Sequence, residues 1–471
     1  MLRLFVHAVF YCATIASSSA LADASTVSNT DDTAAPRQVI LIIGDGMDEQ
    51  QITIARNYLK GASGRLLLDT LPLRSTAQIL TAAESNPAQP VYVADSANTA
   101  TSLATGEVTS RGRIGTSAGT DTDLTSIVQL AEAQGLRTGL VTTASVTDAT
   151  PAAFTAHISF RLCENPTLMR SVEFSDIYLG NCIDDMKANG GKGSIAEQLA
   201  ASRLHVLLGG GAKHFEPSAE NSTLSVAEVA AGNGFTAVTT PQQLNATQAD
   251  QRLLGLFAKS TLPVRLQGED QREAEAPEPS LLNHVHRYLG DVTLPAVMRC
   301  EPNPDFERVP TLKNMTDIAL RQLSHENPRG FFLMIESASI DKQAHERKPC
   351  GSIGELEQLD EALASALAFA KQHPQTLILV TADHSQAAQL IPEESLFAAY
   401  PIPTYTPGKL ARIRTPEGSI MAVNYATTNF MREEHTGASV PLLGNAQARE
   451  SVPAYVQQPE LFAIMRDFLG L

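Results

Sequence analysis

The chain has 471 residues, 43% of them hydrophobic, and a formal net charge of −16. A chain of this length can bury a large core, and average domain sizes would allow two or three domains. The negative balance argues against nucleic acid or an anionic membrane as a functional partner, but a phosphorylated substrate stays possible because only the local field decides its binding.

The N-terminus has the features of a processed export signal. Arg3 precedes the mostly apolar residues 4–16, and Ala20-Leu21-Ala22 is a small-residue cleavage site. The apolar stretch is too short to span a membrane, and no other run approaches the required length. We therefore predict a signal peptide over 1–22 and a flexible mature N-terminus over 23–37. The mature protein is expected in the periplasm, or secreted, without a membrane anchor.

The first predicted strand is the apolar run 38–43, and Gly44-Asp45-Gly46 follows it directly. A carboxylate that is buried at the end of a strand is costly unless it is paired or bound to a cation. Asp45 is therefore either a helix cap or a metal ligand. In open α/β sheets, ligands bind at the carboxyl ends of the strands.

A candidate nucleophile follows within residues 91–106. We predict a strand that ends at Asp95 and a helix that opens with small residues. Ser96 would lie at the N-terminus of this helix, where free N–H groups and the dipole favour an anion. Alternatively, Ser96 is only an N-cap. Because no histidine triad motif surrounds it, a metal ion would have to activate its hydroxyl.

The middle of the chain alternates predicted helices and strands, such as the helix 124–134 and the strand 138–143. The triple glycine 209–211 lacks the pattern of a phosphate-binding loop, and we interpret it as a turn after a strand. The stretch 267–292 is acidic and contains proline, which predicts a surface insertion.

The densest group of candidate ligands lies in residues 336–345. The apolar run 330–335 predicts a buried strand, and Glu336, Asp341 and His345 come after it. Carboxylate oxygen together with imidazole nitrogen suits zinc, and a position with carboxylates alone suits magnesium. On its own, this group could be a solvated acidic turn.

Two later segments repeat the pattern. After a long amphipathic helix predicted over 353–372, the apolar run 376–381 leads to Asp383 and His384. His435 follows in a Glu-Glu-His-Thr-Gly motif. Acids that end three strands at one sheet edge, two of them near a histidine, predict a multinuclear metal centre rather than three helix caps.

The sequence resembles the bacterial, periplasmic type of alkaline phosphatase from about Gln38 to its C-terminus. The motifs that carry the resemblance stand in the family's order: Gly44-Asp45-Gly46-Met47, Asp95-Ser96-Ala97, Asp148-Ala149-Thr150-Pro151-Ala152-Ala153, His157-Ile158-Ser159-Phe160-Arg161, 336–345, Thr381-Ala382-Asp383-His384 and 433–437. The resemblance implies a three-layer α/β/α fold with a large, mostly parallel central sheet, formed by a single domain over 38–471. It also implies a homodimer that hydrolyses phosphate monoesters.

The resemblance further implies a role for each matched residue. Ser96 would be the nucleophile that becomes phosphorylated, and Arg161 would clamp two phosphate oxygens, for which a guanidinium is suited. Asp148 and Lys342 would position Arg161 and the phosphate. The implied metals are two Zn²⁺ and one Mg²⁺ per chain, held by Asp341, His345 and His435 (one zinc), by Asp45, Asp383 and His384 (the other zinc), and by Asp45, Thr150 and Glu336 (magnesium).

Four cysteines remain once the signal peptide, with Cys12, is removed. An even number of cysteines in an exported chain indicates disulfides, and four cysteines allow three pairings. The resemblance implies the pairs Cys163–Cys182 and Cys300–Cys350.

Two other functions stay open on these grounds. A phosphodiesterase or a sulfatase-like enzyme of the same superfamily would share the metal centre. Arg161 with the Asp148/Lys342 pair favours a dianionic monoester instead, and the residues after Ser96 do not match the sulfatase pattern. A non-catalytic phosphate-binding protein would keep the ligands, but it would not need Ser96. We therefore predict a metal-dependent phosphatase that acts on small phosphate monoesters.

Overall fold

The computed structural model describes residues 35–286, 288–393, 400 and 407–471. The predicted signal peptide and most of the predicted flexible segment 23–37 lie outside the described residues. Arg37 already belongs to the first strand, so this strand begins one residue before the predicted run 38–43. The compact unit of the chain is Pro36–Leu471, and all that follows concerns this unit.

A ten-stranded sheet forms the centre of the unit, in the order β22-β2-β21-β17-β1-β16-β5-β8-β10-β9. Its strands are β1 (Arg37–Gly44), β2 (Leu73–Gln78), β5 (Arg137–Ser145), β8 (Val206–Gly210), β9 (Phe235–Val238), β10 (Arg252–Leu256), β16 (Gly330–Ser337), β17 (Thr376–Ala382), β21 (Val440–Gly444) and β22 (Tyr455–Gln457). Only β21 runs antiparallel to its neighbours, β17 and β2. The predicted α/β class with a mostly parallel sheet is confirmed.

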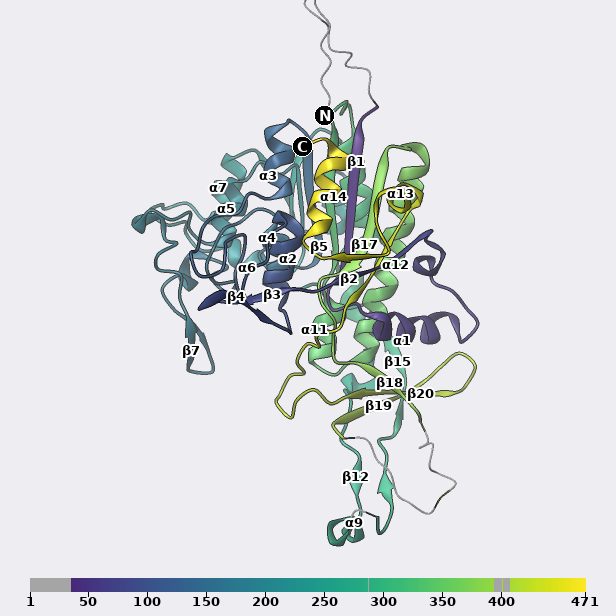
Figure 1. Cartoon of the computed structure of the whole chain (residues 1–471). Coiled ribbons are helices and arrows are strands. Elements are labelled where there is room, and N and C mark those ends of the chain that lie inside the picture. Colours follow the sequence, from purple (N-terminus) through teal and green to yellow (C-terminus); the bar gives the residue numbers. More distant parts are fainter. Residues whose placement is uncertain (1–34, 287, 394–399, 401–406) are drawn as a thin grey trace, which may run out of the picture. The chain divides into compact units, whose positions relative to one another are not determined.

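Helices cover both faces of this sheet, which explains why its central strands are continuous apolar runs rather than alternating ones. The helices are α1 (Glu49–Lys60), α2 (Ser96–Thr105), α3 (Ile127–Ala133), α4 (Ala149–Ala153), α5 (Ile195–Ala201), α6 (Ala212–Phe215), α7 (Val226–Gly232), α8 (Pro241–Asn245), α9 (Leu281–Val285), α10 (Leu312–Ser324), α11 (Ser339–His345), α12 (Pro349–Gln372), α13 (Ala446–Ser451) and α14 (Glu460–Leu469). Helices α10 and α12 pack on one face and α3, α4 and α14 on the other; Figure 1 shows α14 beside β1.

Helix α12 begins earlier than the predicted 353–372, at Pro349, which is well suited to the first turn of a helix. Its first half is buried on nearly all sides, because α1, α10 and α11 pack against it in addition to the sheet. It is therefore less amphipathic than the sequence pattern indicates. No helix among the described residues is long and apolar enough to cross a membrane.

The remaining strands form small sheets at the periphery. They are the pairs β3 (Thr81–Ala83) with β4 (Asn86–Val91), β6 (Val172–Phe174) with β7 (Ile177–Gly180), β11 (Leu266–Gly268) with β15 (Cys300–Pro302) and β12 (Glu278–Pro279) with β13 (Val292–Thr293), and a four-stranded sheet of β14 (Val297–Met298), β18 (Gln389–Ile391), β19 (Lys409–Arg414) and β20 (Ile420–Tyr425).

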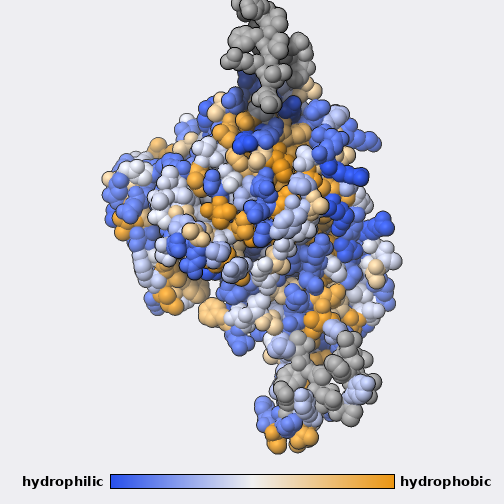
Figure 2. All heavy atoms as spheres, in the orientation of Figure 1, coloured by the Kyte–Doolittle hydropathy of each residue, from blue (hydrophilic) through white to orange (hydrophobic). Residues whose placement is uncertain are grey.

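The predicted insertion 267–292 forms an arm that carries β12, α9 and β13 (Figure 1). The side chains of Leu281, Leu282 and Val285 in α9 are exposed, and Figure 2 shows apolar residues at the tip of this arm. The arm therefore adds little to the hydrophobic core.

Two disulfides join Cys163 to Cys182 and Cys300 to Cys350, which are the pairs that the resemblance implied. The second bond ties β15 to the start of α12. Because each bond restricts the unfolded chain, each is expected to stabilise the fold by roughly 2–4 kcal/mol.

Candidate active site and metal centre

Three buried carboxylates meet at the carboxyl edge of the central sheet. Gly44 at the end of β1 pairs in register with Ser337 of β16 and Ala382 of β17. Asp45 and Asp383 therefore follow directly on adjacent strands. Glu336 is the penultimate residue of β16, so this strand extends further than the predicted run 330–335. All three side chains are almost completely inaccessible to solvent.

The first ligand group consists of Asp45, Asp383 and His384. The Nε2 atom of His384 lies 3.3 Å from Oδ1 of Asp45 and 3.4 Å from Oδ2 of Asp383. Ligand atoms at normal distances from a tetrahedral zinc are about 3.3 Å apart. The two carboxylate oxygens are buried and have no hydrogen-bond partner among the described residues. Such atoms are costly to bury unless a cation binds them, so this group fits a zinc ion.

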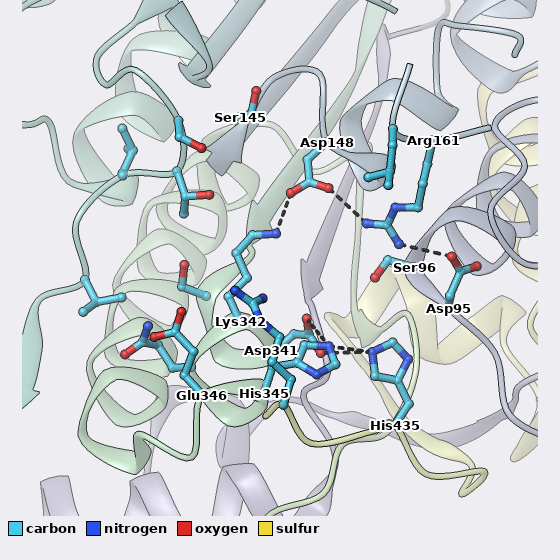
Figure 3. Close-up of a pocket in the computed structure, with 18 of the residues that line it drawn as sticks. Asp95, Ser96, Ser145, Asp148, Arg161, Asp341, Lys342, His345, Glu346 and His435 are labelled. Carbon is cyan, nitrogen blue, oxygen red and sulfur yellow. Dashed lines mark hydrogen bonds and ion pairs between the residues drawn. The ribbon is translucent and has the colours of Figure 1, made fainter. Parts of the chain in front are cut away.

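The second group consists of Asp341 and His345 on α11 and His435 on the loop between β20 and β21. The two histidine Nε2 atoms are 3.0 Å apart. The carboxylate oxygens of Asp341 lie 3.3 Å from Nε2 of His345 and 3.4 Å from Nε2 of His435. Figure 3 shows the three side chains facing one another. Their donor atoms also have the spacing of ligands around one ion.

Hydrogen bonds at the Nδ1 atoms of His345 and His435 explain why the Nε2 atoms of these rings can bind a metal. The Nδ1 atom of His345 contacts the backbone oxygen of Glu433, and that of His435 lies 2.8 Å from the oxygen of Ala94. A carbonyl oxygen only accepts, so Nδ1 carries the hydrogen and a neutral ring presents the lone pair of Nε2. Two lone pairs 3.0 Å apart repel unless a cation lies between them. The histidine pair therefore fits a zinc ion as well.

The pKa shifts show that this cluster holds more negative charge than the protein alone balances. Burial, followed by repulsion from Asp341, Asp383 and Glu336, raises the pKa of Asp45 well above its usual value. Burial also raises the pKa of Glu336 to about 7. Burial opposes the charged form of His435, but Asp341 overcomes this and raises its pKa to about 9. Divalent cations would relieve this imbalance.

Glu336 also belongs to a group of oxygen donors. The hydroxyl of Thr142 donates to Glu336 Oε2 at 2.5 Å, and Thr150 makes a second hydrogen bond to this carboxylate. Thr150 is buried in α4. The carboxylate of Asp45 is close enough to Glu336 for the two negative charges to repel each other. An oxygen-only set of donors fits magnesium better than zinc.

Ser96 is the first residue of α2, and Asp95 is its N-cap, so the alternative that Ser96 is only a cap is wrong. The hydroxyl of Ser96 lies 3.2 Å from Nε2 of His384. The predicted strand ending at Asp95 is also wrong. β4 ends at Val91 and belongs to a small outer sheet, because its prolines, at 87 and 90, cannot donate to a ladder of hydrogen bonds.

Arg161 lies next to Ser96 in the pocket (Figure 3). Its guanidinium contacts Asp95 at 3.2 Å and Asp148 at 3.0 Å, and Lys342 contacts the other oxygen of Asp148. Although burial opposes ionisation, Lys342 and Arg161 hold the pKa of Asp148 well below its usual value. These residues line a pocket of about 820 Å³ that also contains Ser96, Asp341, His345 and His435.

The structure therefore brings together every predicted site residue. Several residues that contact them were not predicted as site residues, and besides Thr142 they include Asp95, Gln386 and Glu433. Asp95 caps α2 and holds Arg161, while Gln386 donates to Oδ1 of Asp341. Glu433 accepts a hydrogen bond from His345 through its backbone oxygen. Asp95 and Glu433 each precede a site residue closely in the sequence, but neither position alone indicates a contact.

Comparisons with known proteins agree with this arrangement. A family model described as alkaline phosphatase matches residues 36–448. Alkaline phosphatase of Escherichia coli (strain K12) is 40% identical over 444 residues, which cover 92% of this chain and 86% of that protein. Streptomycin-6-phosphate phosphatase of Streptomyces griseus is 38% identical over 455 residues, with 95% and 94% covered. The structure of alkaline phosphatase from the Antarctic bacterium TAB5 has a TM-score of 0.62 at 23% identity, covering 93% of this chain and 99% of that chain, and this likeness concerns the fold alone.

Proposed function

This chain belongs to the alkaline phosphatase family and hydrolyses phosphate monoesters, and from this premise we propose that it does so through a phosphoserine at Ser96. The contact that carries the proposal is the 3.2 Å distance between the Ser96 hydroxyl and Nε2 of His384. This contact supports the proposal because the hydroxyl oxygen of Ser96 lies beside a candidate zinc ligand. Arg161, Lys342 and Asp341 line the same pocket as Ser96.

The residues of the chain supply the positioning and part of the positive charge around the phosphate. The N-terminus of α2 directs free N–H groups toward the phosphate that Ser96 would carry. Arg161 donates to two equatorial oxygens of the phosphate, and Asp95 and Asp148 fix the plane of its guanidinium. Lys342 adds a further positive charge. Bound zinc would lower the pKa of the Ser96 hydroxyl and of a water molecule, and it would stabilise the leaving oxygen.

We further propose that each chain holds two Zn²⁺ and one Mg²⁺. Asp341, His345 and His435 would bind one zinc, and Asp45, Asp383 and His384 the other. Glu336, Thr150 and Asp45 would bind magnesium. Elemental analysis of active protein should find about two zinc ions per chain. Less than one zinc per chain would count against the assignment.

Arg161→Ala should weaken phosphate binding while leaving the nucleophile and the metal ligands in place. Two charge-assisted hydrogen bonds to the phosphate would be lost, so we expect kcat/KM to fall by roughly 10²-fold. The inhibition constant of inorganic phosphate should rise in parallel. Arg170→Ala, at an exposed arginine, is the control. Unchanged inhibition by phosphate in Arg161→Ala would contradict the proposed clamp.

The same clamp favours monoesters over diesters. A monoester presents a dianionic phosphate with enough free oxygens for both Arg161 and the metal centre, whereas a diester has one oxygen fewer to offer. We expect p-nitrophenyl phosphate to be a far better substrate than bis(p-nitrophenyl) phosphate. A preference for the diester would favour the phosphodiesterase alternative, and no turnover of either substrate would favour a binding protein.

We propose that the protein is exported to the periplasm and that it acts as a homodimer. Export is supported by the N-terminal signal pattern and by the two disulfides. A dimer is supported by apolar side chains near the pocket that are largely exposed: Tyr92, Phe430 and Met431. Sedimentation should give twice the mass of a chain that begins at Asp23, and N-terminal sequencing should find this residue first.

A further inference from the structure

The histidine ligands of one proposed zinc site come from segments that are distant in the sequence. His345 ends α11, whereas His435 lies in the segment 426–439 between β20 and β21, which forms neither helix nor strand. Phe430 and Met431 in this segment are exposed and bury little apolar surface that could fix it. The position of His435 must therefore depend on polar contacts between this segment and the rest of the protein.

Arg347 makes three of these contacts, and other contacts join His435 to Ala94 and Thr436 to Ser385 and Gln386. The Nε atom of Arg347 donates to Oε1 of Glu433 at 2.6 Å. Its two terminal nitrogens donate to the backbone oxygens of Met431 at 2.8 Å and Phe430 at 2.6 Å. One guanidinium thus binds three points of the segment that carries His435. A planar fork of donors is suited to this because it fixes orientation as well as distance.

Glu433 completes the link on the side of the segment. Its Oε2 atom accepts from the backbone N–H of Thr427 at 2.9 Å and from the Thr427 hydroxyl at 2.6 Å. Its backbone N–H donates to the oxygen of His345 at 3.0 Å, and its backbone oxygen accepts from Nδ1 of the same histidine. Glu433 therefore fixes the segment internally and contacts the opposite zinc ligand directly.

The backbone of Arg347 is held in an uncommon conformation. Its φ angle is 60°, in the left-handed region that side chains other than glycine rarely adopt. Hydrogen bonds from Arg347 N to Ala344 O at 3.0 Å and from Ala274 N to Arg347 O at 2.8 Å hold this turn in place. The turn directs the side chain away from solvent and toward the segment of His435.

The buried ion pair between Arg347 and Glu433 is better explained by the positioning of His435 than by a contribution to the stability of the fold. The side chains of Arg347 and Glu433 are only 4% and 1% exposed. A buried ion pair contributes little net stability compared with apolar residues of similar size. We propose that Arg347 and Glu433 are positioning residues that hold His435 against His345 and thereby set the zinc affinity of the Asp341/His345/His435 site. This inference rests on the zinc site of the proposed function.

The test compares zinc affinities of the intact protein, measured by competition with a chelator. In Arg347→Met, one of the two zinc ions should dissociate at least about tenfold more readily, the size of effect typical for groups that orient metal ligands. The other zinc should change by less than about threefold. In the His435→Ala background, where this site is already impaired, Arg347→Met should cause little additional loss.

Arg56→Met is the control, because Arg56 also pairs with a carboxylate, that of Asp69, in this case through two bonds of 2.7 Å. It should leave both zinc affinities unchanged even if the protein becomes less stable. If Arg347→Met does not fold, Glu433→Gln, which keeps the shape of the side chain and removes its charge, takes its place with the same expected loss.

Unchanged affinity for both zinc ions, or equal weakening of both, would overturn the inference. So would an effect of Arg347→Met that Arg56→Met reproduces. Wild-type protein that binds no zinc would instead refute the proposed metal centre itself. The zinc content of the wild type therefore separates the failure of this inference from the failure of the proposed function.

Discussion

Ser96→Ala should lower the hydrolysis of p-nitrophenyl phosphate by at least about 10⁴-fold, because it removes the one protein atom that we propose forms a bond to phosphorus. The substitution removes one small oxygen beside His384 and leaves both ligand groups and Arg161 in place. Zinc content and the binding of inorganic phosphate should therefore persist. Initial rates at alkaline pH, together with phosphate binding measured by calorimetry, test both expectations.

Ser102→Ala provides the control within the same helix. Ser102 is buried in α2, and its hydroxyl bonds to the backbone oxygens of Asn98 and Glu107 rather than to the pocket. This variant should keep most of the activity. Retention of more than a tenth of the activity in Ser96→Ala would contradict the role of Ser96. A similar loss in both variants would show that damage to α2, and not loss of a nucleophile, explains the result.

Removal of the metals should abolish activity, and zinc together with magnesium should restore it. In the metal-free protein, the free energy of unfolding should also fall as the pH rises. The pKa of Glu336 is raised to about 7 and that of His435 to about 9 in the folded protein. A raised pKa contributes stability at low pH, and this stability is lost as the pH rises through the folded pKa. Between about pH 6 and pH 9 the metal-free protein should therefore lose stability.

Bound cations reverse this trend, because they pair with the ionised carboxylate and with the neutral imidazole. Chemical denaturation of the metal-free and the reloaded protein, at both ends of this pH range, should show a gap in the free energy of unfolding that widens with pH. A gap that stays constant or narrows would contradict the account of the carboxylate cluster. Activity that survives complete chelation would contradict the metal centre.

The central strands and the candidate metal ligands that follow them could both be predicted from the sequence, because both depend on a sheet that is buried on its two faces. The runs 38–43, 330–335 and 376–381 are apolar on both faces, which only a sheet covered on both sides explains. An acidic residue directly after such a run lies at the edge of the sheet, where its charge needs a cation or a hydrogen-bond donor as a partner. Asp45 and Asp383 follow their strands as predicted, and Glu336 lies at the end of its own.

Other features depend on contacts that the sequence does not encode locally. The run before Asp95 looks like a strand, but Asp95 instead caps α2 and pairs with Arg161, a residue far along the chain. Gln386 and Arg347 contact ligands or the segments that carry them only through the tertiary fold. No periodicity or motif marks such residues, because their partners are brought near by the packing of other elements.

The stereochemistry at phosphorus tests the central claim most directly. Hydrolysis through a phosphoserine at Ser96 requires two successive in-line displacements, each of which inverts the configuration. A phosphate ester made chiral with oxygen isotopes, hydrolysed or transferred by the wild-type enzyme, should therefore give a product with net retention. Net inversion would mean that water attacks the substrate in a single step, and it would contradict the covalent role of Ser96.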